Sequence, residues 1–310
     1  FDINDAGDVV GVAEHCPAVL QNSDDFAAFV WSVDGGLGHS SATMHRLDGL
    51  PPGSAPRSGA WAISERFPGG AGPTATVAGW RIDVPGFEKP QRYDARSLSA
   101  NPLPLPPPGT FLYKAGSADG INPGAGTSER IVGQASLSSI RNDACVEEAE
   151  RLPLAWNTGL LSILPFDAPP IFDGRNAFAR DVNDLGVAVG FARDNAETVC
   201  VQRACYWPTP SSISLFAPDP AGPNDNTFAL AINASGAAVG TNATDRLAVS
   251  WPVPTTYVDL TSVTDCLSCG LIDIRSAHDL NGAGWIVATA LRECAPGEAA
   301  EVGVLLVPLG

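Results

Sequence analysis

Three aspartates, Asp2, Asp181 and Asp279, are the residues of this chain whose type and spacing point most directly to metal chemistry. Each lies two residues before an Asn that opens an Asn-x-x-Gly segment. Carboxylate oxygens are the ligands that calcium and other hard divalent cations prefer. The three side chains are therefore candidate ligands of one cation, and the sequence requires no other cofactor. Hydrogen bonding of the same carboxylates to backbone amides at strand ends is the alternative role.

The segment Asp2-x-Asn4-Asp5-x-x-Asp8 resembles part of a calcium-binding loop, in which oxygen ligands recur along the chain. Ala6 stands at the fifth position, and the other copies of the motif keep Asn and Gly but lose most of the acids. A hairpin turn accounts for all the copies, because Asn and Gly both tolerate left-handed backbone angles. We interpret the segment first as a turn.

The seven tryptophans fall into two groups. One group recurs at the end of an apolar run and predicts packing in the core: Trp31, Trp156, Trp207 and Trp251. The other group falls outside that register: Trp61, Trp80 and Trp285. An exposed member of this second group is a candidate platform for stacking against a carbohydrate ring.

Seven cysteines favour an oxidising compartment, where disulfides persist. Five are expected between the second and third strands of their repeats: Cys16, Cys145, Cys200, Cys205 and Cys294. The open alternatives are Cys16 with Cys294, Cys145 with Cys200 or Cys205, and Cys200 with Cys205. Cys266 and Cys269 are expected to close a small ring, because a structural zinc needs four ligands and no second Cys-x-x-Cys accompanies them. An odd count leaves one thiol free or paired outside the chain.

Residues for nucleophilic catalysis are scarce. No Gly-x-Ser-x-Gly elbow occurs, and the four histidines are scattered over different repeats: His15, His39, His45 and His278. The Asp2, Asp181 and Asp279 set is the only support for an enzyme. That alternative is a metal-assisted polysaccharide lyase or hydrolase with its site at a channel mouth.

A recurring unit must position all these residues. An apolar residue, an Asn or Ser that we call the anchor, a Gly turn and a Val-rich run occur six times, 48 to 61 residues apart. The anchors are Asn4, Ser64, Asn122, Asn183, Asn233 and Asn281. Each unit predicts a β-hairpin, followed by a third strand that ends near Trp and a short fourth strand.

Four short strands in about 50 residues, repeated six times, predict an all-β, six-bladed β-propeller of 50–60 residues per blade. We expect one domain over residues 1–310, because a propeller joins its repeats around one axis. The repeats cover approximately 1–53, 54–109, 110–174, 175–222, 223–270 and 271–310.

The repeat is similar to the HAF repeats of bacterial exported proteins, which are named for a His-Ala-Phe start to the third strand. The motif of an apolar residue, Asn, two residues, Gly, one residue, Val-Val-Gly carries the resemblance, together with Ala28-Phe29-Val30-Trp31. Tyr93 and Leu305 occupy roughly the place of Trp in the second and sixth repeats. The resemblance implies an extracellular protein with propeller-like repeats and does not imply a particular reaction.

The sixth repeat ends with Val302–Val307, which corresponds to a third strand, so we expect this blade to lack its fourth strand within the chain. Propellers often complete the last blade with a segment from the N-terminal end. We therefore expect a strand, and before it a signal peptide, to precede Phe1 in the secreted protein. A strand from a neighbouring chain is the other way to complete the blade.

The chain carries 18 basic and 34 acidic residues, for a net charge of −16. This charge argues against nucleic acid or an anionic membrane as partner, because phosphate binding needs clustered Lys and Arg. No segment is long enough to insert into a membrane. The sequence therefore predicts a secreted, non-catalytic binding or assembly module. Its expected partners are a protein or carbohydrate at the cell surface, or further copies of itself.

Overall fold

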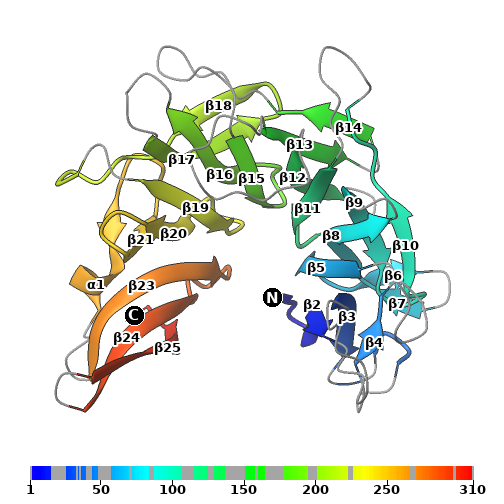
Figure 1. Ribbon diagram of the computed structural model, residues 1–310, viewed down its shortest axis with the longest axis horizontal. Helices are drawn as coiled ribbons and strands as arrows, with labels where there is room; N and C mark the ends of the chain where they lie inside the picture. The colour runs from blue at the N-terminus through cyan, green and yellow to red at the C-terminus, as the bar shows by residue number, and fades with distance from the viewer. Residues whose placement is uncertain are drawn as a thin grey trace. The chain divides into compact units, whose positions relative to one another are not determined.

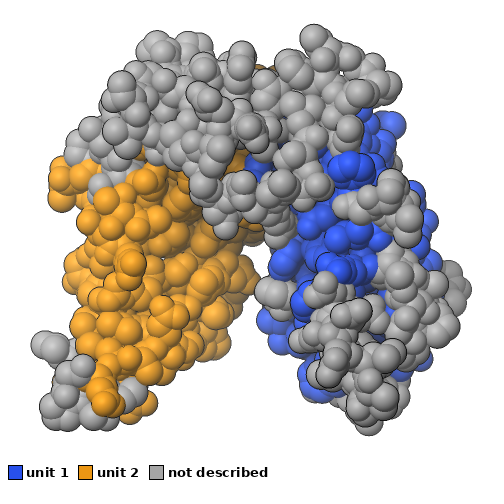
Figure 2. All heavy atoms as spheres, viewed as in Figure 1, with its two compact units in different colours: residues 1–163 blue, residues 164–310 orange. Residues whose placement is uncertain are grey.

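The computed structural model describes residues 2–14, 26–32, 34, 36–39, 44–47, 57–69, 72–83, 87–106, 115–124, 129–136, 151–157, 160–164, 177–194, 201–222, 226–264, 270–295 and 298–308. Their regular structure is almost entirely β-strand, and the α-helix among them, α1 (Leu260–Val263), has four residues. In this part of the chain no helix has the length and apolar character to cross a membrane. Two compact units, Phe1–Ile163 and Leu164–Gly310, divide the chain (Figure 2).

Unit 1 (Phe1–Ile163) contains three four-stranded antiparallel sheets, which we call blades 1, 2 and 3 (Figure 1). Blade 1 consists of β1 (Asp2–Ile3), β2 (Asp8–Glu14), β3 (Phe26–Ser32) and β4 (His45–Arg46). Blade 2 consists of β5 (Arg57–Ile63), β8 (Thr76–Asp83), β9 (Phe87–Asp94) and β10 (Ser99–Pro102). A hairpin of β6 (Phe67–Gly69) and β7 (Gly72–Thr74) is inserted after β5. Blade 3 consists of β11 (Ala115–Ile121), β12 (Arg130–Ser136), β13 (Arg151–Asn157) and β14 (Leu160–Ile163).

Unit 2 (Leu164–Gly310) contains blades 4, 5 and 6. Blade 4 consists of β15 (Ala177–Val182), β16 (Ala188–Asp194), β17 (Val201–Thr209) and β18 (Ser212–Leu215). Blade 5 consists of β19 (Thr227–Ile232), β20 (Ala238–Asn242), β21 (Leu247–Trp251) and β22 (Val258–Asp259). Blade 6 has three strands among the described residues, β23 (Leu271–Leu280), β24 (Ile286–Ala295) and β25 (Glu298–Leu306).

The six sheets confirm the predicted fold class, an all-β propeller with six blades. Each predicted repeat encloses one blade, and each blade is an antiparallel meander in chain order. Within each unit, buried side chains of one blade pack against the next blade, as Val239 and Ala248 of blade 5 pack against Ile274 of blade 6. The prediction of one domain over residues 1–310 stays a prediction, because the contacts group the blades into two units.

The Asn-x-x-Gly segments form the predicted hairpin turns. In blades 1, 4 and 5 the Gly amide donates to the anchor carbonyl, and the Gly has a positive φ of 79° to 86°. A second Gly follows in the second strand of most blades. At Gly240 a Cβ would collide with the carbonyl oxygen of Phe228, where a bulge brings the first strand close. The turn and the bulge therefore account for the glycines of the motif.

Three of the four recurring tryptophans form blade cores, as predicted for the third strands, whereas Trp31 of blade 1 is only half-buried. Trp156, Trp207 and Trp251 are fully buried, and Tyr93 takes this place in blade 2. In blade 6 the pairing of β24 with β25 places Leu306 at the equivalent position, opposite Ile286. The prediction of Leu305 was therefore wrong by one residue, and the period of two turns Leu305 to the other face of the blade.

Candidate functional site

The aspartates before the anchors join neighbouring blades. Asp2 accepts the amide of Ile3 through Oδ1 and the amide of Ile63, in blade 2, through Oδ2 at 2.8 Å. Asp181 repeats this arrangement with Val182 and with Ile232 of blade 5, also at 2.8 Å. Each carboxylate thus holds one amide of its own blade and one of the next, and we call this arrangement the aspartate latch.

Asp279 of blade 6 makes only the first half of the latch. Its Oδ1 accepts the amide of Leu280, and within the described residues it has no other hydrogen-bond partner. The described residues hold no group of three His, Cys, Asp or Glu side chains able to bind a metal ion. The amide hydrogen bonds of Asp2 and Asp181 instead match the strand-end role that the sequence left open as the alternative.

The anchor side chains form a second link between blades. Asn4 Nδ2 donates to the carbonyl of Ser64 at 3.0 Å, and Asn183 Nδ2 donates to that of Asn233 at 3.0 Å. Asn233 Nδ2 in turn donates to the carbonyl of Asn281 at 3.1 Å. Asn281 is exposed, and it uses its Oδ1 for the amides of its own turn. Within the described residues, blade 6 therefore presents a donor, the Asn281 amide group, and an acceptor, the Asp279 carboxylate, without partners from a further blade.

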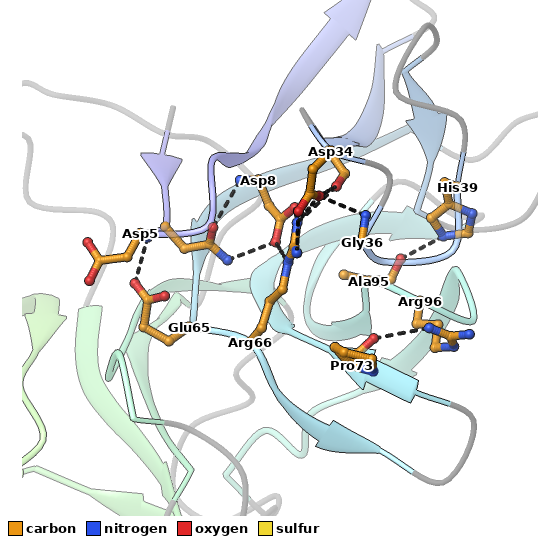
Figure 3. A network of polar contacts seen from close by, with 12 residues as sticks. Asp5, Asp8, Asp34, Gly36, His39, Glu65, Arg66, Pro73, Ala95 and Arg96 are labelled. Atoms are coloured by element: carbon orange, nitrogen blue, oxygen red, sulfur yellow. Dashed lines mark hydrogen bonds and ion pairs between the residues drawn. The ribbon is translucent and has the colours of Figure 1, made fainter.

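Arg66 is the centre of an ionic network in unit 1 (Figure 3). Arg66 follows the anchor of blade 2 and donates through Nε and Nη2 to both oxygens of Asp8, at 2.7 and 2.6 Å. It also donates through Nη1 and Nη2 to Asp34, at 3.0 and 2.6 Å, and to Ser32. Asp8 is fully buried, so the bidentate pair compensates its loss of water.

The carboxylates around Arg66 have pKa values shifted in opposite directions, down at Asp8 and Asp34 and up at Glu65. Burial raises the pKa of Asp8, but the hydrogen bonds from Arg66, Asn4 and Ser32 outweigh burial and lower it. The hydrogen bonds of Arg66 also hold the pKa of Asp34 well below its usual range. Burial raises the pKa of Glu65, which accepts the amide of Asp5. Because the guanidinium is bound on several sides by protein acceptors, the network acts as a structural clamp between blades 1 and 2.

The sequence did not lead us to predict the ionic clamp, although one residue, Asp8, indicated it. Asp8 stands four residues after its anchor, where the other described repeats of this motif carry Val187, Ala237 and Trp285. An acid at a position of β2 expected to be buried needs a cationic partner. The partner lies 58 residues away, on the insertion that carries β6 and β7.

The histidines are held by local contacts. The rings of His39 and His45 stack with their centroids 4.6 Å apart, and His39 Nε2 lies 2.9 Å from the carbonyl oxygen of Ala95. His278 Nε2 lies 2.7 Å from Thr289 Oγ1. His15 lies outside the described residues.

The three candidate tryptophans for ligand stacking differ in exposure. Trp80 is buried and lies against Gly59, where an added Cβ would meet the indole. Trp61 is half-buried in β5, and Trp285 is 44% exposed beside β24. Trp285 therefore has the accessible ring that a stacking site requires, and Trp80 does not.

The structure corrects the predicted position of Cys205. This residue lies within β17, paired with Gly190 and Leu215, and not in the loop between the second and third strands. It is a free, buried thiol whose pKa is raised by burial, so its pairing with Cys145 or Cys200 is not formed. The backbone of Cys294 belongs to β24, which also extends past the predicted loop boundary. The remaining cysteines lie outside the described residues: Cys16, Cys145, Cys200, Cys266 and Cys269.

The free edge of blade 6 borders a groove. No strand pairs with the outer edge of β25 in the described part of the chain. A groove of about 790 Å³ lies along this strand, with a mainly apolar lining. Its walls include Leu260 and Val263 of α1, Ile286 of β24, and Val304 and Leu306 of β25.

The face of blade 6 that carries Val287 is also open. Val287 is 50% exposed, whereas Val10, Val189 and Val239 are fully buried at the same position of their blades. Leu305, opposite Val287, is 54% exposed. Blade 6 therefore combines exposed apolar side chains with a strand edge that no described strand pairs, and it is the candidate binding site of the chain.

Comparisons with known proteins do not assign the chain to a family. No protein-family model matches the chain, and no curated protein matches it either. A solved structure described as YCF48 bound to D1 peptide is similar over 80% of this chain and 68% of its own, with 13% sequence identity and a TM-score of 0.39.

Proposed function

We propose that this protein is a secreted, non-catalytic binding or assembly module whose sixth blade accepts a β-strand from another chain. The propeller fold itself favours a binding or assembly role. The observation that carries the finer proposal is the outer edge of β25, which pairs with no strand of the described residues and lies beside an apolar groove. Strand addition to an exposed sheet edge is a common mode of peptide recognition. The similarity of the repeats to those of exported HAF-repeat proteins supports the extracellular location.

The complete blades define which groups of β25 face the missing strand. In blade 1 the amide of Leu47, just after β4, donates to the carbonyl of Ala28, and in blade 4 the amide of Phe216 donates to that of Ala204. Ala28 and Ala204 each lie opposite the residue of the second strand that follows the second Gly of the motif. In blade 6 the residue at this place is Thr289, and it lies opposite Gly303. Because strand peptide groups alternate, those of Gly303 and Leu305 point to the free edge.

Leu305→Pro tests this function directly. Proline removes the amide that a new strand would use, and it is tolerated on an edge strand because no bond to β24 is lost. Leu305→Ala keeps the amide and serves as the matched control. The probe is a peptide that copies residues 211–217, SSISLFA, which contains the fourth strand of blade 4.

Hydrogen exchange of β25 measures strand addition. We expect the peptide to slow exchange of the Leu305 amide in the unchanged protein, and to protect β25 equally in Leu305→Ala. Leu305→Pro is expected to lose the protection of the rest of β25. Unchanged exchange at millimolar peptide, or equal protection in all three proteins, would overturn the proposal.

A further inference from the structure

The five complete blades end their fourth strand in the same way. The first residue after the strand's last paired position, which we call the closing residue, is always a buried Leu or Phe. The closing residues are Leu47, Leu103, Leu164, Phe216 and Leu260. Three of them also donate their amide to the third strand, to Ala28, Pro90 and Ala204. The chain therefore contains five fourth strands that end in a large apolar closing residue, and within the described residues blade 6 has no such strand.

In blade 6 the closing residue would meet the exposed face of the blade. The amide of the closing residue would donate to the carbonyl of Gly303, which is equivalent to Ala28. The space beside Gly303 is open, because a Cβ added there would have no atom within 4 Å. Leu305 and Val287 are half exposed on this same face. A large apolar closing residue would cover part of this surface, as Leu260 does in blade 5 beside Val239 and Ala248.

The positions one and three residues before the closing residue would point to the opposite face, because side chains alternate along a strand. On that face β25 presents Val304 and Leu306 to the apolar groove, and α1 adds Val263. Blade 3 has Leu161 and Ile163 at these two positions. An apolar groove favours the same kind of side chain at both.

We infer that the groove selects an extended segment of a partner protein with the pattern apolar, any residue, apolar, then Leu or Phe. This inference rests on the proposed strand addition and adds its side-chain code. The two apolar residues of the pattern enter the groove along Val304 and Leu306, and the closing Leu or Phe covers the face beside Gly303.

Isothermal titration with neutral peptides tests the code. The parent peptide, SSISLFA, carries the pattern as Ile213, Leu215 and Phe216. Replacing Leu215 or Phe216 by Ser in the peptide should weaken binding at least about tenfold, because each replacement removes a large apolar side chain from its buried position. A scrambled peptide of the same composition should bind at least as weakly. A neutral peptide is needed because the protein's charge of −16 attracts basic peptides without regard to pattern.

Two variants of the protein locate the site. Val263→Asp puts a charge into the groove at a position that is 65% exposed, so the fold is retained. Val253→Asp makes the same change at a 50% exposed position of blade 5 that does not line the groove. We expect about tenfold weaker binding in Val263→Asp and unchanged binding in Val253→Asp.

The outcomes separate the inference from the function on which it rests. Equal binding of parent, Ser-substituted and scrambled peptides, with β25 still protected from exchange, would overturn the code and leave strand addition standing. No protection by any peptide would overturn both. Concentration-dependent dimers that the peptide dissociates would assign the edge to a second copy and overturn the partner segment.

Discussion

Removal of one aspartate latch, by Asp181→Ala, tests whether these carboxylates stabilise the packing of neighbouring blades. Asp181 accepts the amide of Val182 in its own blade and that of Ile232 in blade 5. Alanine abolishes both hydrogen bonds. Because Ile232 is only 5% exposed, its amide would lose its partner in a nearly buried position.

The expected magnitude follows from these contacts. A buried donor left without a partner costs about 1–3 kcal/mol, and hydrogen bonds to charged groups lie at the upper end of that range. We therefore expect Asp181→Ala to lower the free energy of unfolding by about 2 kcal/mol. Asp279→Ala is the matched control, because among the described residues Asp279 bonds only the amide of Leu280, and Asp279 is exposed. Its expected cost is within about 0.5 kcal/mol.

Urea unfolding followed by tryptophan fluorescence measures the difference, with equal m-values required for the comparison. Asp181→Asn should recover part of the loss, since its amide oxygen accepts a hydrogen bond without carrying a charge. Equal losses in Asp181→Ala and Asp279→Ala would refute the reasoning, because the bond to the next blade would then contribute nothing measurable.

Three further predictions concern other parts of the chain. Arg66→Gln should lower the free energy of unfolding by roughly 3 kcal/mol at pH 7, because it leaves Asp8 buried without its cation. The pKa of Asp8 in the folded protein is lowered, so the stability that its charge contributes is present above pH 3.8, its ordinary pKa, and is lost as the pH falls further. Urea unfolding at decreasing pH should therefore show the difference between variant and parent shrinking below pH 3.8. Gly240→Ala should destabilise unit 2 by at least about 2 kcal/mol, because its Cβ would collide with a backbone carbonyl, whereas Gly282→Ala, with open space around it, should change the thermal midpoint little. The Cys205 thiol, buried and with a raised pKa, should react with iodoacetamide only after unfolding, and mass spectrometry of the labelled native protein would show early modification if this is wrong.

The fold was predictable because its signals are local. An Asn-x-x-Gly turn followed by a Val-rich run specifies a hairpin without information from elsewhere, and Trp156, Trp207 and Trp251 mark the third strands of blades 3, 4 and 5. Six local hairpins at a regular spacing then imply the blades. The error at Leu305 arose where no Trp marks the strand, because a shift of one residue exchanges the two faces.

The polar links between blades were less predictable, because they depend on which residues of separate repeats meet. The sequence shows Asp2 and Asp181 at equivalent positions, yet only the packing of blades reveals that their partners are the amides of Ile63 and Ile232. The Arg66 clamp requires, in addition, the course of an inserted hairpin. The position of Cys205 was predictable, because this residue lies in the apolar run that ends at Trp207, and β17 extends that run back to Val201.

The aspartate latch also gives the blades an order. In both units the blade that follows an Asp-bearing blade has Ala at the equivalent position, Ala62 after Asp2 and Ala231 after Asp181. A blade with its own Asp already occupies the amide that a preceding Asp would need, as Asp2 occupies that of Ile3. Two Asp-bearing blades in succession would thus leave one carboxylate oxygen unused. A complete latch therefore requires that an Asp-bearing blade be followed by a blade without Asp at this position, as in the pairs Asp2–Ala62 and Asp181–Ala231.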